Sequence, residues 1–188
     1  PDTFHKDIEG MSYTETAQYF VDTFHTLDQT VEQVMQEWRD MTIRLYATEV
    51  FPKPGAVEFL QYMKDRGVFL GIATSNNREI AEAALNARGL SCYFDSVRTS
   101  CEVAAGKPAP DVYLKVAEDL GVDPGTCLVF EDVPNGILAG KNAGMEVCAV
   151  DDEFSRPLET EKKRLADYFI HDFNDIFRHT YERCGNRT

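Results

Sequence analysis

The chain has 188 residues, of which 43% are apolar and 27% charged, and its formal net charge is −13 at pH 7. This balance is ordinary for a globular protein, and the length suits one core domain with a small accessory domain. The excess of acidic residues argues against nucleic acid and anionic membranes as partners, because both are bound by basic surfaces.

The first part of the chain, up to about residue 50, contains only helical patterns. Apolar residues recur at helical spacing over residues 17–24 and again over residues 31–45. The segment Pro52-Lys53-Pro54-Gly55 then forms a rigid break. We therefore expect a helical domain over residues 1–50 and a second domain over residues 51–188.

Helix and strand patterns alternate through the second domain. They predict helices over residues 56–66, 78–88, 111–120 and 135–143, each followed closely by a glycine, and a final helix after residue 171. Strands are predicted over residues 68–73, 96–99, 127–131, 146–150 and 167–171. Repeated β-α units predict an α/β fold, a Rossmann-like parallel sheet with helices on both faces. The charged segment 159–164 is interpreted as a solvent-exposed helix face.

Two adjacent carboxylates, Glu131 and Asp132, follow the apolar strand that ends at Phe130. The carboxyl end of a strand in an open α/β sheet faces the crevice where such sheets bind their ligands. Carboxylate oxygens are also the ligands that Mg²⁺ prefers. An alternative is that Asp132 only caps the helix that follows. The residues alone leave both interpretations open.

Two other polar segments lie at comparable places. Thr74, Ser75 and Asn76 follow the strand predicted over residues 68–73, where hydroxyls and free amides can bind an anion or cap the next helix. Lys107 lies in a turn between Gly106 and Pro108, just before the helix predicted from residue 111. The neighbouring prolines could fix the direction of its amine, although an ordinary surface lysine is the simpler interpretation.

Taken in order, these three segments resemble the motifs of the haloacid dehalogenase-like hydrolase superfamily. The resemblance is to the β-phosphoglucomutase-like branch of phosphatases and phosphomutases, and it extends from Gly10-Met11-Ser12 to the strand that ends at His171. It implies a Rossmann-like core with a small α-helical cap domain. It also implies Mg²⁺-dependent phosphoryl transfer through an aspartyl-phosphate, a form of covalent catalysis.

The resemblance assigns a role to each candidate residue. Thr74 would donate a hydrogen bond to the transferring phosphoryl group, with Ser75 and Asn76 nearby. Lys107 would neutralise the charge on the nucleophile and on the phosphoryl oxygens. The metal ligands would be Glu131 and Asp132.

The first motif of the family, an apolar strand that ends in DxDG and carries the nucleophile, does not occur in this sequence. Asp7-Ile8-Glu9-Gly10 has a similar spacing but follows Phe4-His5-Lys6, which is not a buried strand, so we reject Asp7 as the nucleophile. We expect the motif upstream of Pro1, on a strand between those that end at Ala73 and Phe130. A sheet without that strand would leave buried backbone groups unpaired.

The substrate is expected to be a small phosphorylated metabolite, such as a sugar phosphate. In the mutases, the cap segment that resembles Gly10-Met11-Ser12 is followed by an Arg that binds the non-transferring phosphate, whereas Tyr13 stands at that position here. A phenol cannot replace the bidentate guanidinium, so we predict a phosphatase in which Tyr13 contacts the organic part of the substrate. A phosphomutase is the alternative. If Pro1 were the true start, the alternative would be a non-catalytic protein that binds phosphate or a partner.

The five cysteines show no paired CxxC spacing, which predicts free thiols and no zinc site. The sequence contains neither a signal peptide nor an apolar run of transmembrane length. We therefore expect a cytoplasmic protein, and we expect it to be a monomer.

Overall fold

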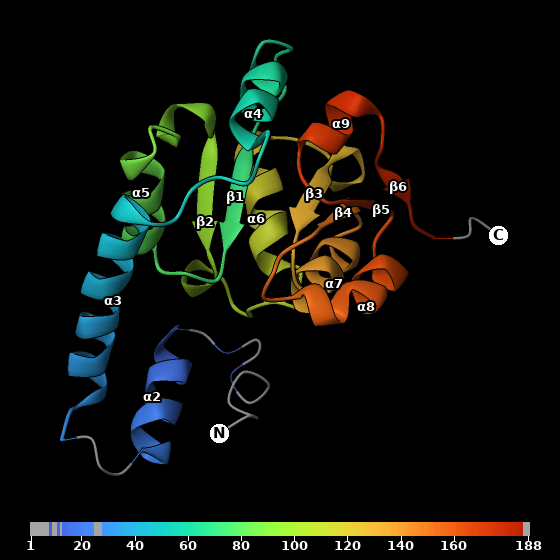
Figure 1. The fold of residues 1–188 in the computed structure, drawn as a ribbon. Coiled ribbons are helices and arrows are strands. Elements are labelled where there is room, and N and C mark those ends of the chain that lie inside the picture. The colour runs from blue at the N-terminus through green and yellow to red at the C-terminus, as the bar shows by residue number, and fades with distance from the viewer. Residues whose placement is uncertain (1–7, 9–10, 12, 25–27, 186–188) are drawn as a thin grey trace.

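The computed structural model describes residues 8, 11, 13–24 and 28–185 (Figure 1). Helices α2 (Tyr13–Thr23) and α3 (Val31–Thr48) pack against each other in the N-terminal part of the chain. The Trp38 ring lies between them, with its centroid 6.2 Å from that of Tyr13 and 5.2 Å from that of Phe20. Helix α3 also lies beside α5 (Arg78–Ala87) (Figure 1), so it contacts both α2 and the α/β part.

The strands form two sheets. In the first, β1 (Gly71–Thr74) pairs in parallel with β2 (Ser96–Thr99). In the second, β3 (Leu128–Glu131), β4 (Glu146–Val150) and β5 (Tyr168–Ile170) are parallel, and the short β6 (Glu182–Arg183) is antiparallel to β5. Every strand predicted from the sequence is present, with bounds that agree to within a few residues, whereas β6 was not predicted.

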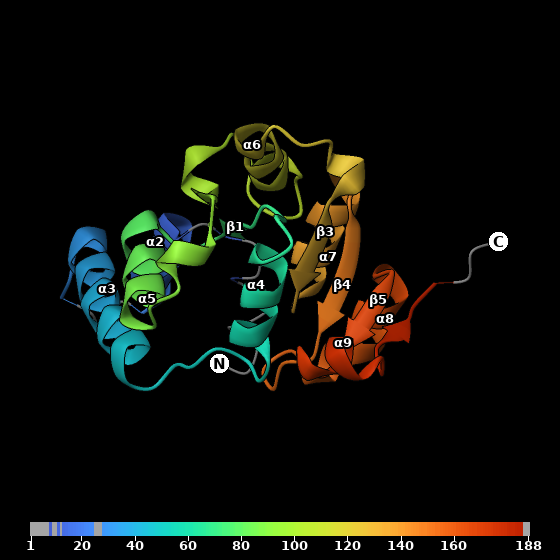
Figure 2. The same cartoon turned by 90° about the horizontal axis from the view of Figure 1, so that it is seen from above.

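Helices cover both faces of these strands, as the alternating pattern predicted (Figure 2). Helix α6 (Asp111–Leu120) packs on β1 and β2, and α7 (Pro134–Asn142) packs on β3 and β4. On the opposite face, α4 (Ala56–Lys64) places Phe59 against Phe130 and against Phe173, which precedes α9 (Asn174–Arg178). Successive side chains of β3 point to opposite faces of the sheet: Val129 faces Gly140 of α7, and Phe130 faces α4. The fold is a Rossmann-like α/β core accompanied by helices α2 and α3.

The two sheets separate between β1 and β3, where we expect another strand from the resemblance to the family. Within the described part of the chain, no backbone ladder joins these two strands. The carbonyl of Ala73 on β1 accepts a hydrogen bond from Lys107 Nζ, at 3.2 Å. Large apolar side chains are exposed at the beginnings of both strands, since Phe69 is 59% and Leu128 47% exposed.

The predicted break at residues 52–55 is a turn that is attached to the core. Gly55 has φ of +75°, and a Cβ at this position would lie 2.7 Å from Asn174 N, so only glycine fits. Pro54 O accepts a hydrogen bond from Phe173 N at 3.0 Å. The Lys53 ammonium donates to Asp151 O at 2.8 Å and to an Asp152 carboxylate oxygen at 2.7 Å. The domain boundary at residue 50 itself stays a prediction.

The charged segment 159–164 forms α8 (Glu159–Leu165), but it is not a uniformly solvated face. Lys162 is fully buried, with 0% of the residue exposed, and its ammonium donates to two protein oxygens. The interpretation of this segment from its charge alone was therefore wrong at one position. No helix in the described residues is long and apolar enough to cross a membrane.

Candidate functional site

The three predicted segments meet at the carboxyl ends of β1 and β3. Thr74 is the last residue of β1, and Glu131 is the last residue of β3. The Lys107 ammonium lies between them, where it donates to Ala73 O at 3.2 Å and forms an ion pair with Glu131 Oε1. One cation thus connects the ends of the two inner strands, at the edge where parallel sheets hold their ligands.

The surroundings of Lys107 show that it is not an ordinary surface lysine. Its side chain is 11% exposed, and its Nζ lies 5.0 Å from the centre of the Tyr113 ring. The loop that carries it is attached to α7, because the Asn142 side-chain amide donates to Pro108 O at 3.0 Å. The amine is thereby directed inward, toward the strand ends.

The Glu131 carboxylate is buried and held on several sides. Lys107 and the Tyr113 hydroxyl both donate to its Oε1, and the Asp132 amide donates to its Oε2 at 3.3 Å. Burial and the negative charge of Glu131 raise the pKa of Tyr113, so this hydroxyl remains a donor. The carboxylate also lies against Gly136, where an added Cβ would be 2.2 Å from the carboxylate carbon. This places the acid beside the first turn of α7, where the helix dipole favours a negative charge.

Asp132 does not cap helix α7, so that alternative interpretation is wrong. The N-cap residue is Val133, and no side chain makes a cap hydrogen bond at this helix. The Asp132 carboxyl is partly buried, and burial, followed by the charges of Glu131 and Asp152, raises its pKa. Crowded acids of this kind are relieved by a cation, and their hard oxygen atoms fit Mg²⁺.

The segment after β1 forms a turn that leads into α5. Thr74 Oγ1 accepts a hydrogen bond from Asn76 N at 3.1 Å, and the Asn76 side chain donates to the Tyr46 hydroxyl at 3.4 Å. Ser75 is exposed. Asn77 caps α5, because its side chain accepts from Ile80 N at 2.9 Å. Capping is thus performed by Asn77, and the role of Thr74, Ser75 and Asn76 as phosphate ligands stays a prediction.

Tyr13 lies in α2 and not among these residues. Its hydroxyl donates to Met35 O in α3 at 2.7 Å, and burial raises its pKa. The predicted substrate contact of Tyr13 stays a prediction. The rejected Asp7 and the segment residues Gly10 and Ser12 lie outside the described residues.

Sequence reasoning missed several residues that shape the site. Tyr113 and Gly136 fix the Glu131 carboxylate, and Ser155 donates its hydroxyl proton to Asp132 O at 2.6 Å. A tyrosine in a helix and a serine in a charged loop carry no pattern of their own. Gly136 was placed within the helix predicted over residues 135–143, without a role of its own.

Comparisons with known proteins agree with this geometry. The model of the haloacid dehalogenase-like hydrolase family matches residues 5–144. The putative pyrophosphatase PpaX of Clostridium perfringens is 30% identical over 168 residues, which cover 87% of this chain and 78% of that protein. Hexitol phosphatase A of Escherichia coli is 36% identical over 123 residues, which cover 65% of this chain and 55% of that protein.

Other relatives are matched over a smaller part of their length. The chain spans 32% of the bifunctional riboflavin kinase/FMN phosphatase of Arabidopsis thaliana and 50% of the putative phosphatase YhcW of Bacillus subtilis, and it is 37% identical to each over the aligned residues. Activities of whole relatives therefore do not transfer directly to this chain.

Solved structures share the fold. A β-phosphoglucomutase of Clostridium difficile superimposes with a TM-score of 0.74 at 21% identity, covering 96% of this chain and 80% of that one. A putative β-phosphoglucomutase of Thermotoga maritima gives a TM-score of 0.69 at 26% identity, covering 96% and 82%. The resemblance inferred from the three motifs is confirmed, and the match over residues 5–144 means that this chain belongs to the haloacid dehalogenase-like hydrolase family.

Proposed function

We propose that the protein is a Mg²⁺-dependent phosphatase that acts on a small phosphorylated metabolite, such as a sugar phosphate, through an aspartyl-phosphate. The observation that carries this proposal is the position of the Lys107 ammonium between Ala73 O and Glu131, with Asp132 adjacent. Phosphoryl transfer depends mainly on positioning and electrostatic stabilisation, which a fixed cation and paired carboxylates supply. Relatives named hexitol phosphatase and fructose-1-phosphate phosphatase support this class of substrate.

Each side chain has a simple task in this proposal. Thr74, at the end of β1, donates its hydroxyl proton to a phosphoryl oxygen, with Ser75 and Asn76 beside it. The Lys107 ammonium balances the charge of the phosphoryl oxygens, because two protein acceptors already direct it toward the strand ends. Glu131 and Asp132 would hold Mg²⁺, which when bound offsets negative charge on the phosphate.

Two protein carboxylates suffice for Mg²⁺ only if other oxygen atoms complete its shell. No cluster of three or more metal-binding side chains occurs among the described residues. Magnesium usually retains several water ligands and also coordinates the substrate phosphate, so two protein carboxylates are a typical number of side-chain ligands for it. Further ligands would come from the strand that carries the nucleophile.

We place that strand between β1 and β3. Among the described residues, β1 pairs only with β2 and β3 only with β4, so each has one edge without a strand partner. Exposed apolar side chains lie near the beginnings of both strands. A parallel apolar strand inserted there would pair with both edges and cover Phe69 and Leu128. Its carboxyl end would then lie beside Lys107, where a nucleophilic aspartate is needed.

The test is hydrolysis of small phosphomonoesters by the full-length protein with and without Mg²⁺. We expect release of inorganic phosphate that disappears after exhaustive chelation and returns when Mg²⁺ is added. Turnover that survives chelation would contradict the metal assignment. An isomerised sugar phosphate as the product, without release of phosphate, would favour a phosphomutase.

We also propose that the protein acts as a monomer in a reducing compartment such as the cytoplasm. All five cysteines lie within the described residues, and all are free thiols. Cysteines that stay unpaired are typical of proteins in reducing compartments. Sedimentation of the full-length protein at several concentrations tests the monomeric state.

A further inference from the structure

Lys162 is a buried cation behind the proposed metal site. The residue is 0% exposed, and its ammonium donates to Val150 O at 3.0 Å and to Ser155 Oγ at 2.9 Å. Burial lowers the pKa of Lys162, while the negative charges of Asp151 and Asp132 act in the opposite direction. A lysine side chain is among those least often found in a protein interior, because burying its charge is costly.

Ser155 connects this lysine to Asp132. The serine is 2% exposed, and its hydroxyl accepts from Lys162 and donates to Asp132 O at 2.6 Å. The two hydrogen bonds run in the same direction: the ammonium donates to the hydroxyl, and the hydroxyl donates to the backbone carbonyl. Connected hydrogen bonds of this kind polarise and strengthen one another in a buried setting.

A hydrogen bond to the carbonyl of Asp132 can affect the orientation of the proposed metal ligand. It belongs to the peptide between Asp132 and Val133, at the point where β3 has ended and α7 begins at Pro134. The orientation of this peptide sets the direction of the Asp132 side chain. Residues that orient metal-binding groups from behind typically change metal affinity by about 10–100-fold when they are replaced.

The second bond of Lys162 fixes the segment that carries the serine. Val150 is the last residue of β4, and Ser155 follows five residues later, so the ammonium ties the two ends of this short loop together. An apolar side chain could fill the same volume, and buried charges are seldom retained for stability alone. The polar contacts of Lys162 therefore need another explanation.

We propose that Lys162 and Ser155 are positioning residues that hold the Asp132 peptide in the orientation needed to bind a divalent cation. This inference rests on the proposed function, because it takes Asp132 as a metal ligand. Neither side chain touches the metal or the substrate. Lys162 acts through Ser155, and Ser155 acts through the backbone of Asp132.

The experiment measures Mg²⁺ binding to the full-length protein by calorimetry without substrate, together with the melting temperature. Ser155→Ala removes the hydroxyl that joins the two partners, and Lys162→Met removes the ammonium while retaining a long apolar side chain. We expect each to weaken Mg²⁺ binding by about 10-fold, the lower end for groups that orient metal ligands. Excess Mg²⁺ should restore most of the turnover.

Lys163→Met is the matched control. Lys163 is the next residue of the same helix, its side chain is 28% exposed, and it forms ion pairs with Glu159 and Glu182, both at 2.9 Å. The substitution removes the same charge without touching Ser155. Because partly exposed pairs contribute little, we expect Mg²⁺ affinity within about twofold of the wild type.

Asp132→Asn separates this inference from the proposed function. If Asp132→Asn binds Mg²⁺ as the wild type does, the metal assignment fails, and the inference fails with it. If Asp132→Asn loses binding while Ser155→Ala stays within about twofold of the wild type, only the inference is overturned. A lower melting temperature with unchanged affinity, or an equal loss in the Lys163 control, overturns it too. Ser155→Ala decides the matter should Lys162→Met fail to fold.

Discussion

The Glu131 carboxylate has little freedom, because three residues from different elements enclose it. Lys107 comes from the loop before α6, Tyr113 from α6 itself, and Gly136 from the first turn of α7. Two donors share one carboxylate oxygen, and the missing side chain at position 136 makes room for the group. The acid is therefore placed before any substrate arrives, which is what electrostatic stabilisation of a transferring phosphoryl group requires.

Gly136→Ala should damage both the site and the fold. A methyl group there would lie 2.2 Å from the Glu131 carboxylate carbon, so either the acid or the helix must move. We expect a loss of about 1–3 kcal/mol in the free energy of unfolding, as for other overpacked positions, together with a large loss of turnover. Urea denaturation and phosphate release measure the two effects.

Gly140→Ala is an unsuitable control, because Val147 lies 2.8 Å from a Cβ there. Gly144→Ala tests backbone strain alone, since no atom lies within 4 Å of a Cβ at that position.

Replacing Lys107 by Met should lower turnover by about 10²–10³-fold, the usual effect of losing one aimed electrostatic donor. Stability should fall too, because Glu131 would remain buried with the Tyr113 hydroxyl but without its cation. Steady-state kinetics with a generic phosphoester, and thermal melting in parallel, test both statements. Near wild-type activity in Lys107→Met would mean that another residue supplies the charge.

The site residues that could be predicted from the sequence are those with distinctive neighbours. Lys107, Glu131 and the end of β1 come together as predicted. Partners such as Tyr113 and Ser155 could not be predicted, because contacts between distant segments leave no periodic trace in one sequence. The same limit explains Lys162, whose charged neighbours suggested solvent while the tertiary structure buries it.

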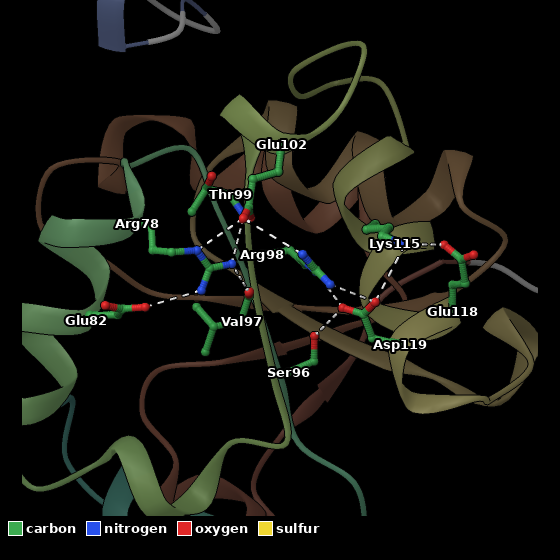
Figure 3. Close-up of polar contacts among 10 residues, drawn as sticks. All are labelled: Arg78, Glu82, Ser96, Val97, Arg98, Thr99, Glu102, Lys115, Glu118 and Asp119. Atoms are coloured by element: carbon green, nitrogen blue, oxygen red, sulfur yellow. Dashed lines mark hydrogen bonds and ion pairs between the residues drawn. The ribbon is translucent and has the colours of Figure 1, made fainter.

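Among the elements, β2 is an edge strand protected by charged side chains (Figure 3). Arg98 forms a bidentate pair with Asp119 of α6, with Nε–Oδ2 at 2.5 Å and Nη2–Oδ1 at 3.0 Å. Arg78 of α5 donates to the Val97 carbonyl at 2.8 Å and pairs with Glu102. Charged groups on an edge discourage pairing with another chain, so this cluster is adequately explained by the fold.

The ion pair between Arg98 and Asp119 should make the free energy of unfolding depend on pH in the acidic range. Hydrogen bonds from Arg98 and then Ser96 lower the pKa of Asp119 to about 2, from an ordinary value of 3.8. A carboxyl with a lowered folded-state pKa stabilises the protein above its ordinary value, and this contribution is lost as the pH falls toward 2. Asp119→Asn should therefore be less stable than the wild type at neutral pH, with the difference shrinking between about pH 4 and pH 2.

Urea denaturation of both proteins across that pH range measures the difference. Glu118→Gln is the matched control, because Glu118 is the neighbouring acid on α6 and its side chain is well exposed. A constant gap between Asp119→Asn and the wild type down to pH 2 would contradict the assignment.

Element prediction succeeded where local signals agreed with tertiary packing. The helix over residues 111–120 and the strands over 96–99 and 146–150 have the predicted bounds. Strand β1 begins at Gly71, later than predicted, since Val68 and Phe69 are apolar but find no strand partner here. The two residues of β6 carry no alternating pattern, and only their pairing with β5 identifies them.

Helices α2 and α3, which together form a helical lobe, are joined to the α/β core by more than the turn at Gly55. Helix α3 contacts the core through an ion pair between Arg39 and Glu79 of α5, at 3.0 Å, and through the Tyr46 hydroxyl, which accepts a hydrogen bond from Asn76 in the turn before α5. The Asn76 contact is notable because that residue belongs to the proposed phosphate segment. This contact connects the lobe to the proposed site, as our proposal requires if the lobe is a cap that excludes water and selects the substrate.

We expect the proposed cap and the core to respond differently to substitution. Tyr13→Ala is expected to change the preference among phosphorylated substrates and to affect small artificial esters less, because these barely reach a cap. Asp132→Ala should impair the turnover of every substrate alike, since the metal serves the common phosphoryl step.

The Tyr13 hydroxyl donates a hydrogen bond to Met35 O, so Tyr13→Ala also disturbs the packing of α2 on α3. Tyr13→Phe separates these effects, because it keeps the ring against Trp38 and removes only the hydroxyl. The measurement is kcat/KM for each variant over one panel of substrates. If Tyr13→Ala lowers all substrates equally while Tyr13→Phe changes none, the residue supports the cap without selecting the substrate, and the division of roles between lobe and core is wrong.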